Sequence, residues 1–261
     1  MLRRWCILLA MLALAAGTAF TATSASASTT AGTFNPGGTM RLAGGASSQA
    51  RGISNEVSST NWSGYAGTTG TYTSVSASWT QPTGTCKSGD QYAAFWVGLD
   101  GYSSSTVEQT GSEVDCVGRT AEYYAWYEAY PAASENYSNT VKPGDHFNAT
   151  VTYSGSNKFS LYIADTTQGW SHTTSVTVRG AARSSAEVIV EAPCCTNSGG
   201  ILPLTDFGTV SLTSSMANGS AIGNAGGLTE IIMQDSQGRD EDTVSSLSGG
   251  ENFSATWVRS N

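Results

Sequence analysis

The sequence is poor in histidine, since His146 and His172 are the only two among its 261 residues. Neither lies in a nucleophile or metal-binding motif, so we expect both to be turn or surface residues. A phosphate-binding loop, a dinucleotide fingerprint and the Asp-Thr-Gly signature of aspartic proteases are also missing. Any hydrolytic chemistry would therefore have to come from carboxylates and amides, and we expect no metal or other cofactor.

Basic residues are scarce as well. Only 12 Lys and Arg stand against 20 Asp and Glu, which gives a formal net charge of −8 at pH 7. A nucleic-acid-binding protein needs a basic stripe or patch to neutralise phosphates. This composition provides none, and we expect no nucleic-acid partner.

Only one apolar run is long, and it lies at the N-terminus. Met1–Arg4 is a short positive start, Trp5–Phe20 is apolar and uncharged, and Ala25–Ala27 is a small-residue cleavage pattern. Residues 1–27 are therefore predicted to be a secretory signal peptide. We expect a secreted, extracellular protein that is not held in a membrane after cleavage.

The next 30 residues are rich in Gly, Ser, Thr and Ala. Such a segment buries little surface, so residues 28–57 are predicted to be either a propeptide or a disordered leader. In the first case Arg41 and Arg51 could lie near an acidic cleft and hold it shut. Residues 58–261 then form one domain, which we expect to be a monomer.

The number of cysteines outside the predicted signal peptide is even. Cys6 lies within that peptide, which leaves Cys86, Cys116, Cys194 and Cys195 for an oxidising compartment. Our preferred pairing is Cys86–Cys116 with Cys194–Cys195. A bridge between adjacent cysteines is strained, so cross-pairing stays an alternative.

Short runs of alternating apolar and polar residues recur after the leader, separated by Gly, Ser, Asn and Pro. This pattern is typical of an antiparallel β-sandwich or barrel, so the fold class is predicted to be all-β. The predicted strands are Tyr72–Trp79, Tyr92–Leu99, Ala121–Tyr130, His146–Tyr153, Lys158–Asp165, Thr173–Arg179, Ala186–Glu191, Thr209–Leu212, Glu230–Gln234 and Ser254–Val258.

Two of these strands show which face carries function. A period of two separates the aromatic and acidic residues of each strand from its small or aliphatic ones. In one strand the first group is Glu122, Tyr124, Trp126, Glu128 and Tyr130. In the other strand Glu187, Ile189 and Glu191 face away from Ala186, Val188 and Val190. A face of aromatics and carboxylates suits a cleft for an extended polymer.

Several short segments form an ordered pattern. Trp-Val-Gly-Leu-Asp-Gly occupies residues 96–101, Gln-Thr-Gly residues 109–111, and Ala-Trp-Tyr-Glu-Ala-Tyr-Pro residues 125–131. Asn-Trp-Ser-Gly precedes them at 61–64, and Ala-Glu with an apolar strand follows at 186–191. Each segment alone could be an ordinary strand or turn. In this order they resemble the glutamic peptidases (eqolisins), and we expect a bacterial-type member.

The resemblance implies a secreted acid endopeptidase that acts on proteins and peptides. It also implies a sandwich of two large antiparallel sheets, of the concanavalin A-like lectin type. Carried over residue by residue, Gln109 and Glu187 fall on the catalytic pair. The positions that line or support the substrate cleft are Trp96, Asp100, Tyr124, Trp126 and Glu128. Two positions depart from the fungal pattern, which has Asp where Tyr124 and Glu113 stand.

A glutamine and a glutamate are chemically sufficient for amide hydrolysis. A carboxylate such as Glu187 can take a proton from water and return it to the leaving amine. The Gln109 amide offers two donors, one of which can stabilise the oxyanion. A glycoside hydrolase, with Glu128 paired to Glu187 or Asp100, and a carbohydrate-binding module without catalysis are the two alternatives.

Overall fold

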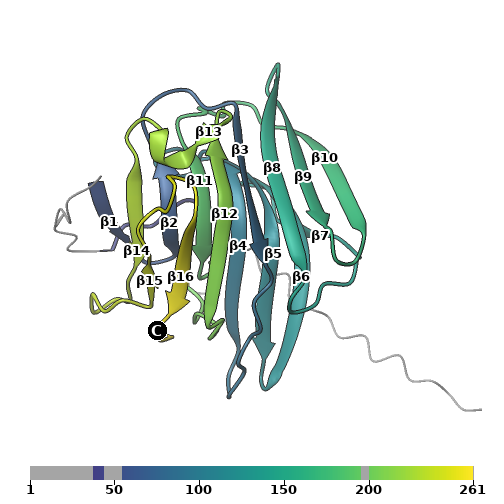
Figure 1. The fold of residues 1–261 in the computed structure, drawn as a ribbon, viewed down its shortest axis with the longest axis vertical. Helices are drawn as coiled ribbons and strands as arrows, with labels where there is room; N and C mark the ends of the chain where they lie inside the picture. The colour runs from purple at the N-terminus through teal and green to yellow at the C-terminus, as the bar shows by residue number, and fades with distance from the viewer. Residues whose placement is uncertain (1–37, 44–54, 195–199, 261) are drawn as a thin grey trace, which may run out of the picture. The chain divides into compact units, whose positions relative to one another are not determined.

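The structure is a computed structural model that describes residues 38–43, 55–194 and 200–260. The described residues belong to one compact unit, Phe34–Asn261. They fold almost entirely as β-strands in two packed sheets, as Figure 1 shows, so the predicted all-β sandwich is confirmed. Each predicted strand overlaps an observed one, while β1, β2, β5 and the short β7 of the first sheet and the short β13 and β15 were not predicted.

The first sheet has eight strands and is antiparallel except where β1 and β14 run parallel. Their order across the sheet is β1 (Asn55–Ser59), β14 (Thr229–Met233), β2 (Trp62–Gly67), β11 (Ala186–Glu191), β4 (Gln91–Leu99), β5 (Val107–Val117), β6 (Thr120–Tyr130) and β7 (Glu135–Asn136). Strand β1 begins three residues before the expected domain boundary at Ser58.

The second sheet covers one face of the first. Its order is β10 (Trp170–Thr177), β9 (Lys158–Asp165), β8 (His146–Gly155), β3 (Ser74–Thr80), β12 (Thr209–Ala217), β16 (Phe253–Trp257) and β15 (Asp242–Val244). The short β13 (Ser220–Ala221) pairs with β12 and leads into a 3₁₀ turn, η1 (Ile222–Asn224). Both histidines lie in this second sheet, in β8 and β10.

The main core lies between the two sheets and follows the alternation of the strands. Ala186, Val188 and Val190 of β11 point into it, as the sequence predicted. Burying a large aliphatic or aromatic side chain stabilises a fold by about 1.5–3 kcal/mol, so this face fixes how each strand is oriented. The opposite face of β11 then necessarily carries Glu187, Ile189 and Glu191.

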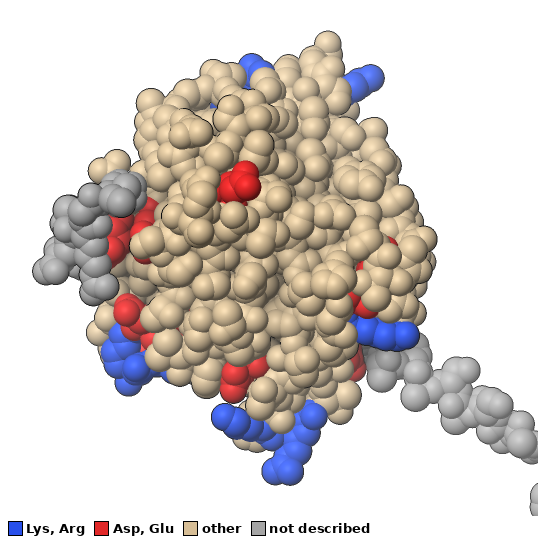
Figure 2. Space-filling model, viewed as in Figure 1, with Lys and Arg blue, Asp and Glu red and all other residues tan. Residues whose placement is uncertain are grey.

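The outer face of the second sheet is rich in hydroxyl groups and poor in charge. Residues such as Ser76 and Ser78 on β3 alternate with core residues, and Thr150 and Thr152 do so on the neighbouring β8. Figure 2 shows this side of the molecule as largely uncharged, with most Lys, Arg, Asp and Glu near its margins. A surface of this kind gains little charge repulsion when the pH falls.

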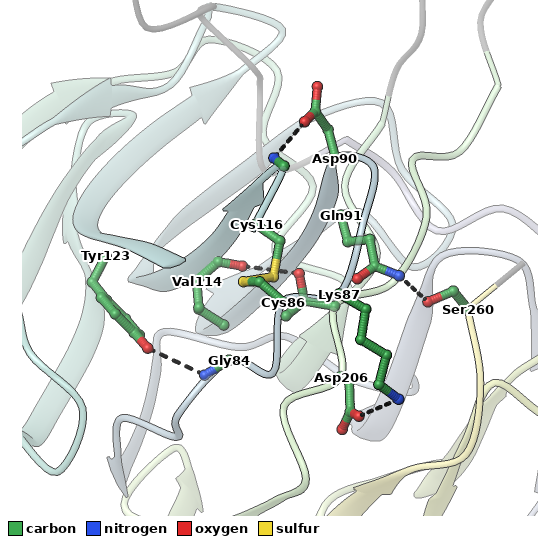
Figure 3. The surroundings of a disulfide bond; sticks show 12 residues. Gly84, Cys86, Lys87, Asp90, Gln91, Val114, Cys116, Tyr123, Asp206 and Ser260 are labelled. Carbon is green, nitrogen blue, oxygen red and sulfur yellow. Dashed lines mark hydrogen bonds and ion pairs between the residues drawn. A yellow bond between two sulfur atoms is a disulfide. The ribbon is translucent and has the colours of Figure 1, made fainter. Parts of the chain in front are cut away.

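A disulfide joins Cys86, in the loop before β4, to Cys116 near the end of β5 (Figure 3). This confirms one expected pairing and excludes cross-pairing of these two cysteines. Cys194 is also disulfide-bonded, but Cys195, its expected partner, lies outside the described residues. A Lys87–Asp206 ion pair of 3.7 Å ties the same loop to the segment before β12.

The predicted signal peptide, residues 1–27, lies outside the described residues. Among the residues that are described, no helix is long and apolar enough to cross a membrane.

Candidate active site

The face of the first sheet that points away from the second sheet carries most of the predicted site residues, and we call it the site face. Strand registers place four residues in one row across it. Glu128 on β6 lies opposite Gln109 on β5, Gln109 opposite Gly98 on β4, and Gly98 opposite Glu187 on β11. Residues far apart in the chain are thereby brought side by side, and the predicted pair shares this row.

Gly98 separates the two members of the pair. Neighbouring strands lie about 4.8 Å apart, so the Cα atoms of Gln109 and Glu187 are about 10 Å apart across Gly98. A Cβ atom on Gly98 would lie 2.8 Å from a ring atom of Trp96 and 3.2 Å from Cβ of Gln109. Glycine is therefore required at this position because the Trp96 ring packs over it, between the amide and the carboxyl group.

Gln109 is fully buried and is held by one strong hydrogen bond. Its Nε2 donates to Oε2 of Glu128 at 2.6 Å. Burial, and then the charge of Glu191, raises the pKa of Glu128 to about 9. Glu128 is therefore protonated in acid, and it orients the amide of Gln109 without adding a negative charge beside it.

Glu187 is fully buried as well, and among the described residues the Ser185 hydroxyl acts on its carboxyl group, although not with the geometry of a full hydrogen bond. Burial raises its pKa well above the usual range, the Ser185 hydroxyl partly offsets this, and the charges of Asp100 and Glu108 add to it. A carboxyl group in such surroundings holds its proton readily and is suited to acid–base work.

Three tryptophans pack on the site face next to this row. Trp62 lies edge-on to Trp96, with ring centroids 4.8 Å apart and an interplanar angle of 75°. The indole N–H of Trp96 donates to Oε2 of Glu191 at 2.9 Å. Trp96 and Trp126 flank Gly111, at which a Cβ would lie 2.5 Å from Cβ of Trp96. The predicted cleft residues Trp96 and Trp126 thus form one aromatic floor.

Tyr124 and Glu113 lie in a different row, four residues along β5 from Gln109. At about 3.4 Å per residue this is roughly 13 Å from the pair, so the structure does not bring Tyr124 next to it. The Tyr124 hydroxyl donates to Glu122. Burial, and then the neighbouring Asp115, raises the pKa of Glu113 well above its usual range. In the described part of the chain, no group of three or more His, Cys, Asp or Glu residues is arranged to hold a metal ion.

Asp100 does not belong to the row of the pair. It follows β4 directly, is fully buried, and has a positive φ of 70°. Its carboxylate accepts hydrogen bonds from the backbone N–H groups of Arg183 and Ser184, at 2.6 and 2.9 Å. These contacts tie the Asp100 side chain to the segment that leads into β11.

Part of the predicted leader contacts the site face. In the segment Gly38–Ala43, the Met40 N–H donates to the carbonyl oxygen of Gly101 at 3.1 Å, and the Met40 side chain packs against the tryptophan cluster. Arg41 donates its N–H to Asn61 Oδ1 at 2.8 Å and its guanidinium to the Cys194 sulfur at 2.9 Å. Arg51, the other leader arginine, lies outside the described residues.

Sequence reasoning did not assign a role to Gly98 or Glu108. Gly98 lies inside the Trp-Val-Gly motif and Glu108 directly precedes Gln109, but neither residue carries a local pattern that indicates its place in the site. Glu191 was expected on the same face as Glu187, as an acid that tunes it, and it lies four residues after Glu187 on that face of β11.

Comparison with known proteins identifies the family of the chain. The model of the Peptidase A4 family matches residues 60–257. A structure of scytalido-glutamic peptidase with a transition state analog inhibitor is similar with a TM-score of 0.66 and 24% identity, covering 76% of this chain and 98% of that one. SCP-B, an eqolisin solved with the tripeptide Ala-Ile-His, gives 0.62 and 23%, with the same coverage of both chains.

Aspergilloglutamic peptidase from Aspergillus niger is 26% identical, with a TM-score of 0.57, covering 64% of this chain and 99% of that one. A comparison with curated protein sequences finds no match. The structural likenesses support the same sandwich fold, and the family match covers most of the chain. The chain therefore belongs to the Peptidase A4 family and is a hydrolase of the glutamic endopeptidase class.

Proposed function

We propose that this protein is a secreted acid endopeptidase in which Gln109 and Glu187 form the catalytic pair. The observation that carries the proposal is the row across the site face. An amide held by a protonated acid and a buried carboxyl group lie on either side of a glycine, in one row and on one face of the sheet.

The chemistry needs only these two side chains and water. Burial raises the pKa of Glu187 while the leader segment is in place, so Glu187 serves as a base in acid only after removal of the leader lets water reach it and lowers that pKa. Ionised Glu187 then takes a proton from water, and the water oxygen attacks the peptide carbonyl carbon. One N–H of Gln109 is engaged by Glu128, and the other is available to the oxyanion that forms on the carbonyl oxygen. Such a donor is worth about 3–4 kcal/mol. Glu187 then passes its proton to the amide nitrogen as the carbon–nitrogen bond breaks.

The acid next to Gln109 favours activity at low pH. Glu128, whose pKa is raised to about 9 by burial, is neutral in acid. As the pH rises it ionises and places negative charge beside the Gln109 amide, where the oxyanion forms. We expect activity to fall for this reason as the solution becomes neutral and then alkaline.

The leader supports a latent form of the enzyme. Gln109 and Glu187 are fully buried, and Met40 packs on the neighbouring tryptophan cluster. A polypeptide substrate cannot reach buried side chains, so the segment Gly38–Ala43 must be removed or displaced before catalysis. N-terminal sequencing of the active secreted protein tests this. A start beyond Ala43 is expected, and a start at Ser28 in fully active protein would contradict it.

The geometry favours a peptidase over a glycoside hydrolase. Gln109 lies between Glu128 and Glu187 in the row across the site face. Its amide donates to Glu128, and glycosidic chemistry, which uses two carboxyl groups, has no use for an amide at this position.

Two substrate classes distinguish these functions. Leader-free protein should release peptides from casein between about pH 3 and 6 and should release no sugars from a panel of polysaccharides. Sugar release without casein cleavage would overturn the proposal. Binding to a polysaccharide without turnover of either class would indicate a binding module.

A further inference from the structure

We propose that Asp100 is a positioning residue, which holds the start of β11 so that Glu187 stands opposite Gly98 and Gln109. It would then act through the backbone rather than by contact with substrate. This inference rests on the proposed peptidase function, but part of its test does not depend on activity.

Glu187 depends on its backbone for its position. It is the second residue of β11, and the hydroxyl that acts on its carboxyl group is that of Ser185, two residues earlier in the same stretch of backbone. Its Cα position is fixed by pairing with Ala66 on β2 and Gly98 on β4. Whatever determines where β11 begins therefore also determines where the Glu187 carboxyl group points.

Asp100 makes the contacts that determine this. Its Oδ2 accepts the Arg183 N–H at 2.6 Å, and its Oδ1 accepts the N–H and hydroxyl of Ser184 at 2.9 and 3.1 Å. Its own N–H donates to the carbonyl oxygen of Ser185 at 3.1 Å. One residue thus binds three consecutive residues immediately before β11, in register with the Leu99–Ala186 pair.

The backbone of Asp100 is adapted to this role. Its φ of 70° lies in the left-handed region, where Asp and Asn are tolerated better than most residues. The Ser104 hydroxyl donates to Oδ1 at 3.2 Å and accepts the Gly101 N–H at 2.8 Å, which closes the turn behind the carboxylate. The backbone of Arg183, whose N–H binds the Asp100 carboxylate, is also in the left-handed region, with φ of 54°.

The charge of Asp100 has a second effect on Glu187. The charged or titratable groups that act on Glu187 are Asp100 after β4, Glu108 on β5 and the Tyr72 hydroxyl before β3. Asp100 and Glu108 both raise the pKa of Glu187. Removing the charge of Asp100 should therefore lower the pKa of Glu187 and move the acidic limb of the pH–rate profile to lower pH.

Asp100→Asn is the informative variant, because asparagine tolerates the same backbone conformation. It keeps Oδ1 but replaces Oδ2, the acceptor of the Arg183 N–H, with a donor. Amide exchange followed by NMR should show faster exchange at Arg183 and unchanged exchange at Leu161 in β9. Unchanged protection at Arg183 would overturn the inference, whether or not the protein is a peptidase.

Kinetics on a protein substrate complete the test. We expect kcat of Asp100→Asn to fall by at least tenfold, KM to stay within about twofold, and the acidic limb to shift downward, since small misplacements of a reacting group cost up to about 10²-fold. A rise in KM with unchanged kcat would assign Asp100 to substrate binding instead. The control is Asp90→Asn, an exposed aspartate that accepts the Gly118 N–H at 2.9 Å, which should leave both parameters unchanged. If the wild type cleaves no protein, the proposed function fails. The exchange result still shows whether Asp100 holds the segment before β11.

Discussion

Replacing Glu108 with glutamine should make the stability of the protein less dependent on pH. Glu108 is fully buried on β5, directly before Gln109. Burial, and then the charge of Asp100, raises the pKa of Glu108 from 4.5 to about 8, against a smaller opposing effect of Thr106. The folded protein therefore keeps a proton on Glu108 at pH values at which the unfolded chain has released it.

The sign and size of the effect follow from proton linkage. Because the folded-state pKa is raised, the stabilising contribution is fully present below about pH 4.5 and is lost as the pH rises through about 8. Each pH unit in this window costs about 1.4 kcal/mol. Between pH 4.5 and pH 7 the wild type should lose about 3 kcal/mol of unfolding free energy through this one group. Glutamine has no proton to release, so the variant should not lose it.

Urea unfolding followed by tryptophan fluorescence measures this difference. The unfolding free energy of Glu108→Gln relative to wild type should shift by about 3 kcal/mol in favour of the variant between pH 4.5 and 7. The matched control is Glu56→Gln, at a half-buried position on β1, whose stability should follow the wild-type pH curve. Parallel curves for Glu108→Gln and wild type would refute the reasoning.

Three further substitutions test other parts of the structure. Removing the disulfide with Cys86→Ala and Cys116→Ala opens a loop with a sequence separation of 30 and should cost about 3–4 kcal/mol in urea unfolding; a loss below about 1 kcal/mol would contradict this. Gly98→Ala places a methyl group against Trp96, so kcat should fall at least tenfold in a peptide assay. Wild-type turnover would show that the Trp96 ring can move aside without loss of activity. Trp96→Phe removes the donor to Glu191 and should cost about 1–3 kcal/mol of unfolding free energy, whereas an unchanged urea midpoint would mean that this hydrogen bond contributes nothing.

Strands with strict alternation were predictable from local sequence. The predicted bounds of Lys158–Asp165 and Ala186–Glu191 match β9 and β11 at both ends, because both segments are short and rich in apolar residues and polar or turn residues bound them. The same alternation assigned Glu187 to the face opposite the core before any register was known.

Strand β5 shows why other parts were not predictable. Polar residues occupy both of its faces, so the usual alternation of apolar and polar residues is absent. The inward Ser112 accepts the Trp79 indole N–H at 2.8 Å, and the Thr110 hydroxyl donates to the carbonyl oxygen of Trp126 at 2.7 Å. Partners on other strands make these buried polar side chains tolerable, and local sequence does not reveal such partners.

Which residues lie next to each other in the site could not be predicted for the same reason, because it depends on how the strands pair. Gln109 and Glu187 were assigned by family resemblance, but that Gly98 separates them follows only from the pairing of β4 with β5 and β11. A leader that covers the cleft was expected only through Arg41 and Arg51, and the contact of Met40 with the tryptophan cluster was not predicted.

The most direct test of the central claim is the turnover number of Gln109→Ala and Glu187→Gln on a protein substrate in acid. With leader-free protein, kcat should fall by about 10²–10³-fold in Gln109→Ala through loss of the oxyanion donor. Turnover should be nearly abolished in Glu187→Gln, which cannot accept a proton from water. Far-UV circular dichroism should show both variants folded. Wild-type turnover in either folded variant would contradict the assignment of Gln109 and Glu187 as the catalytic pair.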